Sequence, residues 1–198
     1  MDEHELARRL RSGWVSDPPD LAPAAAAAGL LDVAYATSDS PVGELLLALT
    51  PVGLVRLAYL GPGEADAVLG GLAERVSPRI LASPRILDPV RRELDGYFAG
   101  HRRHFGIPVD WRLTTGFGRR VLQATAAIPY GATASYAEIA RRAGSPRAFR
   151  AAGNALGANP LPIFVPCHRV LHSGGGLGGY TGGVERKLAL LGVEGVRL

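Results

Sequence analysis

Three short apolar runs near the start of the chain constrain its fold more than any other feature. They cover Val33–Thr37, Gly43–Leu49 and Leu54–Tyr59, and turn signals at residues 40–41 and 51–53 separate them. Runs of this length, rich in aliphatic residues and bounded by Pro, Gly and Ser, are typical of strands. Because short turns join neighbouring strands in opposite directions, the pattern predicts a small antiparallel sheet.

Helical patterns follow the three predicted strands. They cover Ala65–Arg75 and Asp88–Phe98, and Gly100 ends the second. Residues 32–100 are therefore predicted to form an α+β domain. Residues 1–31 precede it with an amphipathic helix candidate at Leu6–Trp14 and a stretch rich in proline and alanine. Such a composition is typical of a linker or a weakly ordered extension.

The second half of the chain has a different pattern. Residues 101–113 form a connecting segment, and residues 114–198 are predicted to be a mainly α-helical domain. A first helix, capped by Thr114 or Thr115, runs to about residue 127, and Ser135 can cap a second over residues 136–143. After a Gly-containing break at residues 144–146, a third helix covers residues 147–156. Two short helices around such a turn predict a helix-turn-helix of the winged-helix-like kind.

Charge is divided unevenly between the two halves. Residues 1–98 carry 9 arginines against 14 acidic residues, a net charge of −5; residues 99–198 carry 13 basic against 4 acidic residues, a net charge of +9. A basic half suits contact with a polyanion, although a solvated arginine-rich surface would have the same composition. The predicted helix at residues 147–156 combines Arg147 and Arg150 with several alanines, so it could approach a DNA groove closely.

Composition excludes several classes of protein. No run approaches the roughly 18 apolar residues of a membrane span, and the acidic N-terminus does not resemble a signal peptide. We therefore expect a cytoplasmic protein without a membrane partner. Cys167 is the only cysteine, which excludes an internal disulfide and a multi-cysteine zinc site. Neither a metal nor a cofactor is expected.

The segment that leads to Cys167 is the most informative part of the sequence. An apolar run ends at Pro166, and proline favours the first position of a helical turn. Cys167 is therefore expected at a helix N-terminus, where backbone N–H groups and the neighbouring His168 and Arg169 would lower the pKa of its thiol. Because adjacent residues on a turn point about 100° apart, His168 is expected to reach the sulfur through a bridging water. The alternative is a buried, unreactive cysteine.

These residues closely resemble the active-site signature of the O6-alkylguanine-DNA alkyltransferases. The resemblance runs from about residue 116 to 195 and includes residues 128–131, 135–136, 159–162, 166–170 and 178–183; residues 33–98 are similar only in general pattern. It implies direct-reversal DNA repair: a single, irreversible transfer of a methyl or larger alkyl group from O6-alkylguanine, flipped out of duplex DNA, onto Cys167. O4-alkylthymine is a further candidate substrate. The resemblance also implies a monomer off DNA that needs no cofactor.

The resemblance assigns roles to the residues that would carry out the reaction. Cys167 is the alkyl acceptor, His168 its water-mediated base and Glu194 the acid that orients this base. Asn159 braces the network. Tyr136 would crowd the 3′ phosphate, help rotate the nucleotide outward and donate a proton to N3 of the leaving guanine.

Other residues would bind DNA or the flipped base. Arg150 is expected to enter the duplex and fill the vacated space, with Arg147 and Arg169 as further DNA contacts. The resemblance implies that the pocket is lined by Tyr180, Thr181 and the backbone of Val170. The family usually has a small residue where Phe149 stands, so this side chain faces either the core or the DNA.

Three other functions remain as alternatives. A non-catalytic sensor of alkylated lesions, of the alkyltransferase-like type, would flip the base without repairing it, but such proteins lack the acceptor cysteine that Cys167 would supply. A transcriptional regulator that uses an alkylated cysteine as its signal would carry further cysteine-rich modules. A thiol hydrolase usually draws its cysteine and histidine from distant segments, unlike the adjacent Cys167 and His168.

Overall fold

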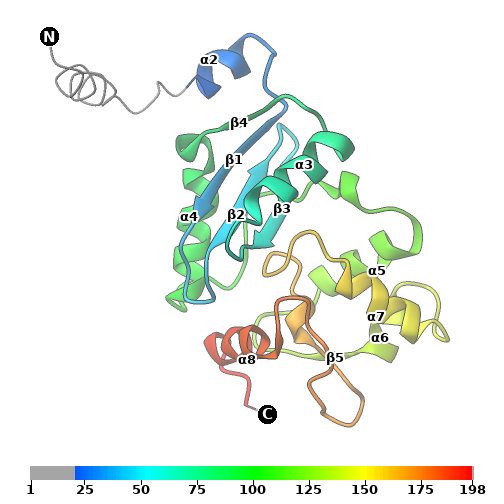
Figure 1. Cartoon of the computed structure of the whole chain (residues 1–198). Helices are drawn as coiled ribbons and strands as arrows, with labels where there is room; N and C mark the ends of the chain where they lie inside the picture. The colour runs from blue at the N-terminus through cyan, green and yellow to red at the C-terminus, as the bar shows by residue number, and fades with distance from the viewer. Residues whose placement is uncertain (1–20, 198) are drawn as a thin grey trace, which may run out of the picture.

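A computed structural model describes residues 21–197, and its N-terminal part is a small α+β unit (Figure 1). The helix expected at residues 6–14 lies outside the described residues. Within the alanine-rich stretch, helix α2 covers Ala22–Ala27. This stretch was expected to be a linker or a weakly ordered extension, and these six residues of it are helical: alanine has the highest helix propensity, and Pro23 stands where a helix accepts proline.

The sheet of the N-terminal part has the strand order β3-β2-β1-β4. Its strands are β1 (Val33–Ser38), β2 (Leu45–Leu49), β3 (Leu54–Tyr59) and β4 (Ile80–Ala82). The antiparallel pairing predicted for the first three is confirmed. The sheet as a whole is mixed, because β4 pairs with β1 in parallel. Strand β4 was not predicted, because three residues are too few to show an alternating pattern.

Helices cover both faces of this sheet. Leu45 and Leu47 of β2 belong to the same core cluster as Leu94 of α4 (Pro84–Phe98), whereas Leu46 packs in a second cluster with Leu72 of α3 (Ala65–Arg75). Successive residues of a strand point to opposite faces, so a strand covered on both sides must be apolar throughout. This explains the uninterrupted apolar sequence of β2. The α3 prediction is confirmed, and α4 begins at Pro84 instead of Asp88.

The C-terminal part is mainly helical, and the predicted helix-turn-helix is confirmed in α6 and α7. Ser135 caps α6, since its Oγ accepts the Glu138 N–H at 3.1 Å. Thr115 holds the N-cap position of α5, but its side chain makes no capping bond. The elements in chain order are η1 (Trp111–Leu113), α5 (Gly116–Ala126), β5 (Ala134–Ser135), α6 (Tyr136–Arg142), α7 (Phe149–Gly157), η2 (Cys167–Arg169), β6 (Val170–Leu171) and α8 (Val184–Val193).

One hydrophobic cluster joins the two parts of the chain. It contains Leu57 and Tyr97 from the N-terminal part and Leu161 and Cys167 from the C-terminal part. At the edge of the sheet, the Leu57 N–H donates to the carbonyl oxygen of Pro160 at 2.9 Å. The edge strand β3 therefore holds the segment that leads to Cys167.

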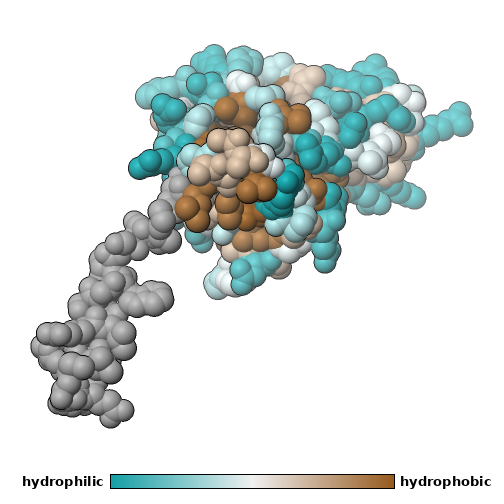
Figure 2. Space-filling model, turned by 90° about the horizontal axis from the view of Figure 1, so that it is seen from above, coloured by the Kyte–Doolittle hydropathy of each residue, from teal (hydrophilic) through white to brown (hydrophobic). Residues whose placement is uncertain are grey.

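The outer surface of the N-terminal part carries several exposed apolar side chains. Leu21, Leu30 and Leu81 are among them, and Figure 2 shows brown surface at this end of the molecule, beside the grey residues. Within the described residues 21–197, no helix is both long and apolar enough to cross a membrane.

Candidate active site

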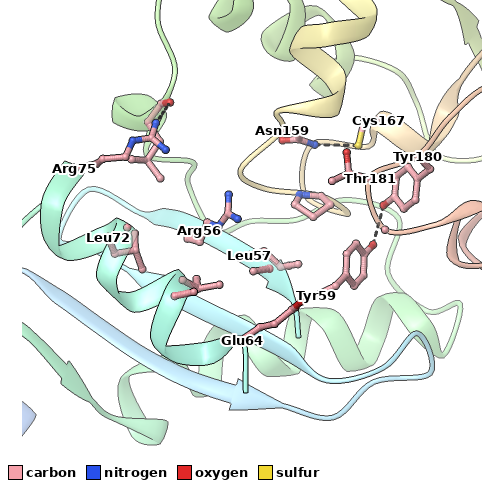
Figure 3. Close-up of a pocket in the computed structure, with 17 residues that line it drawn as sticks. Arg56, Leu57, Tyr59, Glu64, Leu72, Arg75, Asn159, Cys167, Tyr180 and Thr181 are labelled. Atoms are coloured by element: carbon pink, nitrogen blue, oxygen red, sulfur yellow. Dashed lines mark hydrogen bonds between the residues drawn. The ribbon is translucent and has the colours of Figure 1, made fainter. Parts of the chain in front are cut away.

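Cys167 is held in place by a side chain from the end of α7. Its Sγ accepts a hydrogen bond of 3.1 Å from Asn159 Nδ2, which also donates to the Val165 carbonyl at 2.8 Å (Figure 3). Asn159 Oδ1 accepts the Leu161 N–H at 3.0 Å. The amide thus connects both ends of the segment before the cysteine. The resemblance implies a bracing role for this residue.

The segment between Asn159 and Cys167 is buried and strained. Ile163 has a φ of 74°, a left-handed conformation that is unfavourable for a β-branched residue. Such a conformation costs about 1–3 kcal/mol and persists only where the surroundings enforce it. Here Ile163 and Val165 are fully buried. Tight packing of the segment therefore fixes the position of the sulfur.

His168 is fully buried and lies in a polar network next to the cysteine. Its Nε2 lies 2.7 Å from Glu194 Oε1, while its Nδ1 has no hydrogen-bond partner in the described part of the chain. Since a neutral imidazole has one donor and one acceptor nitrogen, an Nε2–H that donates to Glu194 leaves a lone pair on Nδ1. The structure thus provides a proton acceptor at the Nδ1 of His168.

Glu194, at the end of α8, is the centre of this network. Besides His168, its carboxylate accepts hydrogen bonds from Arg169 Nε at 2.9 Å, from the Tyr97 hydroxyl at 2.8 Å and from the Gly131 N–H at 3.1 Å. Burial alone would raise the pKa of Glu194, but the hydrogen bonds from His168 and Arg169 outweigh it and hold the pKa at about 2. Glu194 is therefore a buried carboxylate anion at neutral pH.

Arg169 belongs to this network rather than to a DNA-contacting surface. It is only 6% exposed, and its guanidinium donates to Glu194 and to the Ile128 carbonyl. The structure therefore contradicts the expected DNA contact. Arg169 already neutralises the charge of Glu194. A protonated His168 would therefore be a second buried cation beside a single carboxylate. Burial, with the charge of Arg169 adding to it, accordingly lowers the pKa of His168 despite its bond to Glu194.

The thiol of Cys167 also differs from the expectation. Cys167 begins a helical turn as predicted, but η2 is only three residues long and the residue is 7% exposed. Burial therefore raises the pKa of the Cys167 thiol, although the Asn159 hydrogen bond and the charge of Lys187 act in the opposite direction. The prediction of a lowered pKa is wrong, because desolvation exceeds the contribution of a single helical turn. A thiol of this kind needs a base to become nucleophilic.

Lys187 is a functional candidate that the sequence analysis missed. It is 1% exposed, and its Nζ donates to the carbonyl oxygens of Val170, at 2.7 Å, and Leu177. Burial lowers its pKa to about 8. It is the only lysine in the sequence, and this is the one sequence feature that could have drawn attention to it. Its bond also occupies a lone pair of the Val170 carbonyl, the backbone group expected to face the substrate.

A cavity of about 570 Å³, which we call the helix-side cavity, opens between α6, α7 and the glycine-rich loop at residues 173–183. Tyr136, Arg150, Tyr180 and Thr181 line it together with Cys167, so the structure brings these predicted residues together. Phe149 also lines it and is 47% exposed, so this side chain does not face the core. Arg147 is exposed nearby but does not line this cavity.

The glycine-rich loop packs closely against both parts of the chain. Its Tyr180 hydroxyl lies 2.8 Å from that of Tyr59 on β3, a partner that the sequence analysis missed, and Thr181 Oγ1 donates to the Gly157 carbonyl at 2.7 Å. A Cβ on Gly182 would lie 2.6 Å from the Tyr59 ring. This close approach requires glycine. Within the described part of the chain, no group of three His, Cys, Asp or Glu residues is arranged to hold a metal ion.

Comparison with known proteins connects this geometry with one family. The model for the DNA-binding domain of 6-O-methylguanine DNA methyltransferase matches residues 116–196, and the model for its ribonuclease-like domain matches residues 33–111. The chain is 41% identical to the methylated-DNA–protein-cysteine methyltransferase of Mycolicibacterium paratuberculosis over 82% of this chain and 92% of the relative. It is 37% identical to the constitutive enzyme of that name from Bacillus subtilis, over 81% and 94%.

Solved structures agree with these matches. The Mycobacterium tuberculosis OGT in complex with DNA superposes with a TM-score of 0.70 at 41% identity, over 81% of this chain and 92% of that chain. The structure of M. tuberculosis O6-methylguanine methyltransferase has a TM-score of 0.71 at the same identity, over 82% and 92%. Sequence, fold and site geometry thus lead to one conclusion: the chain belongs to the 6-O-methylguanine DNA methyltransferase family.

Proposed function

We propose that this protein repairs alkylated DNA by direct reversal, with Cys167 as the acceptor of a methyl or larger alkyl group from O6 of guanine. The observation that carries this proposal is the position of Cys167. Cys167 lines the helix-side cavity, and the next residue is His168, which is buried and hydrogen-bonded to Glu194. The only thiol of the chain thus lies where a flipped guanine could enter the cavity and where the thiol proton could pass towards His168.

The reaction follows from the unpaired Nδ1 of His168 and the raised pKa of the thiol. His168 Nδ1 takes the thiol proton through a water molecule. A lone pair of the resulting thiolate attacks the alkyl carbon in line, a new C–S bond forms, and the C–O6 bond breaks with its electron pair passing to guanine. The Tyr136 hydroxyl supplies the proton that guanine takes at N3. Reversal would require the thiolate to leave the unactivated alkyl carbon of the thioether, so each molecule reacts once and guanine is restored.

Delivery of the base requires a different set of residues. O6 is out of reach in a stacked duplex, so the nucleotide must rotate out of the helix at a cost of a few kcal/mol. Arg150 extends from the second helix of the helix-turn-helix and would fill the space left behind, while Arg147 would neutralise a phosphate. The relative from M. tuberculosis, whose structure was determined with DNA, supports this mode of binding.

The competing function is a non-catalytic sensor of alkylated lesions. Such a protein needs the helix-side cavity and the DNA-binding helix, but it needs neither a thiol nor a base. Here Cys167 is hydrogen-bonded to Asn159, the adjacent His168 is hydrogen-bonded to Glu194, and all four residues are buried. A polar network of this kind is expensive to bury unless it is fully organised, so its presence favours group transfer over sensing.

A mass measurement tests the proposal. The full chain, incubated with an equimolar duplex that contains one O6-methylguanine, should gain the mass of one methylene on the peptide that contains Cys167, and no more than one equivalent. The Cys167→Ala variant should bind the same duplex without any gain. Tight binding of the wild-type protein without a mass change would instead establish the lesion sensor.

A further inference from the structure

Cys167 borders a second cavity on the opposite side of the glycine-rich loop. This interdomain cavity, of about 500 Å³, lies between β3 and α3 of the N-terminal part and the segments around Asn159 and Tyr180 (Figure 3). It shares Cys167, Tyr180 and Thr181 with the helix-side cavity. The wall formed by β3 and α3 takes no part in the proposed proton transfer, so the role of the side chains that it presents to the cavity remains to be assigned.

This wall combines an apolar floor with two arginines. Ala67 and Val68 provide accessible apolar surface above the buried Leu72, and Arg56 extends from β3 into the space in Figure 3. The Arg56 guanidinium makes no hydrogen bond or ion pair with any residue between 21 and 197, and burial together with the charge of Arg75 lowers its pKa. An arginine that is partly buried beside a like charge is stabilised when an anion binds it.

The other charged groups around the cavity do not satisfy Arg56. Arg75 donates to the Leu113 carbonyl at 3.1 Å. The one carboxylate of the wall belongs to Glu64, whose Oε2 accepts the Gly61 N–H at 2.8 Å. No described carboxylate lies within ion-pair distance of either arginine. This wall thus carries two positive charges and one negative charge beside a cavity that Cys167 also lines.

We propose that the interdomain cavity accepts O6-alkyl chains that end in a carboxylate, and that Arg56 binds this carboxylate. This inference rests on the proposed alkyl transfer. In-line attack places the first alkyl carbon between Sγ and O6, so the remainder of a longer chain must turn aside. The guanine occupies the helix-side cavity, and the second cavity bordered by Cys167 is the interdomain one. Methylene groups would lie over Val68, and the terminal carboxylate would meet the Arg56 guanidinium.

The chemistry of the transfer is unchanged by the longer chain. The C–S bond forms as the C–O6 bond breaks, guanine leaves with the electron pair and gains its proton, and the product is an S-carboxyalkyl thioether. Arg56 touches only the far end of the chain. It therefore affects which alkyl group is accepted and leaves methyl transfer untouched.

Single-turnover transfer rates test this inference. Duplexes carrying O6-(ω-carboxyalkyl)guanines of increasing chain length are each compared with the n-alkyl lesion of the same length. For the wild-type protein, the ratio of the carboxylate rate to the neutral rate should rise with length to about fivefold to tenfold, as expected for one charge-assisted hydrogen bond at a partly solvated site. In Arg56→Gln this ratio should fall to about one or below.

Two controls separate the possible outcomes. Arg85→Gln removes one exposed positive charge from α4, away from the cavity, and should keep the wild-type ratio. Methyl transfer should be unchanged in Arg56→Gln, which shows that the variant is folded and active. A ratio that is the same in wild type and Arg56→Gln at every length overturns the carboxylate site. Failure of methyl transfer in the wild-type protein would instead refute the proposed function.

Discussion

The two sides of Cys167 are built in opposite ways. On one side, His168, Arg169, Glu194 and Tyr97 are buried and bonded to one another, with the Nδ1 of His168 as the one buried side-chain atom in this group that lacks a partner among the described residues. On the other side, Arg150 and its neighbours around the helix-side cavity are largely exposed. Chemistry and delivery are therefore separable here: a buried network sets the protonation states, and an exposed surface is left for the proposed DNA contacts.

The largest expected effect follows from changing the centre of the buried side. Glu194→Gln should lower the transfer rate about 100-fold, the usual contribution of a positioned general base, while affinity for methylated duplex remains within about twofold. It should also lower the free energy of unfolding by about 3 kcal/mol, because Arg169 is left buried without its carboxylate. Single-turnover kinetics and urea denaturation measure both. Glu185→Gln, an exposed acid on the same helix, is the control; an equal loss in the two variants would contradict the account.

Substitutions on the exposed side should lower the transfer rate on duplex DNA or the affinity for duplex DNA, and by less than the change at Glu194. Arg150→Ala should lower the transfer rate on duplex DNA about 30-fold, because nothing fills the space left by the flipped base, and stability should be unaffected. Arg147→Ala should instead weaken binding of methylated and unmethylated duplexes alike, as expected for a phosphate contact. Fluorescence anisotropy and single-turnover rates distinguish the two. Identical behaviour of both variants would show that Arg150 is merely another phosphate contact.

The pH dependence of transfer reports on the buried side alone. His168 must be neutral to accept the thiol proton, and its pKa lies below the ordinary value of 6.5. The rate should therefore be flat from pH 8 to 7 and fall by up to about tenfold per pH unit below the pKa of His168. Glu194, with its folded pKa lowered to about 2, contributes stability above its ordinary pKa of 4.5 and loses it only as the pH falls towards 2. Its contribution to stability is thus retained in this range. A rate that climbs tenfold per unit from pH 7 to 9 would instead indicate attack by a free thiolate.

A smaller effect is expected from the one member of the network that comes from the N-terminal part. Tyr97→Phe removes the hydrogen bond to Glu194 and keeps the aromatic contacts with Phe98, Phe105 and Tyr130. The transfer rate should fall about fivefold and the stability by about 1 kcal/mol. Tyr35→Phe, on β1, is the matched control. An unchanged rate in Tyr97→Phe would show that the N-terminal part supports the fold without influencing the chemistry.

The smallest expected effect concerns the aromatic side chain at the start of α7. Phe149 is exposed beside Arg150, whose guanidinium carbon lies 5.8 Å from the centre of its ring. Apolar side chains presented to DNA can press between base steps. Phe149→Ala should therefore weaken duplex binding about threefold, measured by anisotropy. The equally exposed Leu188→Ala, on α8, should not.

Much of the site could be predicted from the sequence because its residues lie close together in one segment. Asn159, Cys167 and His168 lie within ten residues, so local motifs single them out together, and the structure brings Asn159 to the Cys167 sulfur. Tyr97 and Tyr59 could not be found in this way, because each reaches the site through tertiary contacts from the N-terminal part.

Burial is the property that the sequence did not reveal. Arg169 was expected to contact DNA, yet Glu194 holds it in the interior. The pKa of Cys167 was expected to be lowered because helix position and charge are visible in the sequence and desolvation is not. Strand β4 was missed because pairing with β1, and not its own three residues, makes it a strand.

One comparison tests the separation of chemistry and delivery most directly. Transfer rates of Glu194→Gln and Arg150→Ala are measured on methylated duplex and on the free nucleoside O6-methylguanosine, which needs no flipping. The account predicts that Glu194→Gln loses about 100-fold on both substrates, whereas Arg150→Ala loses its rate on the duplex and matches the wild-type protein on the nucleoside. Equal losses for Arg150→Ala on the two substrates would contradict the division between a buried chemical side and an exposed delivery side.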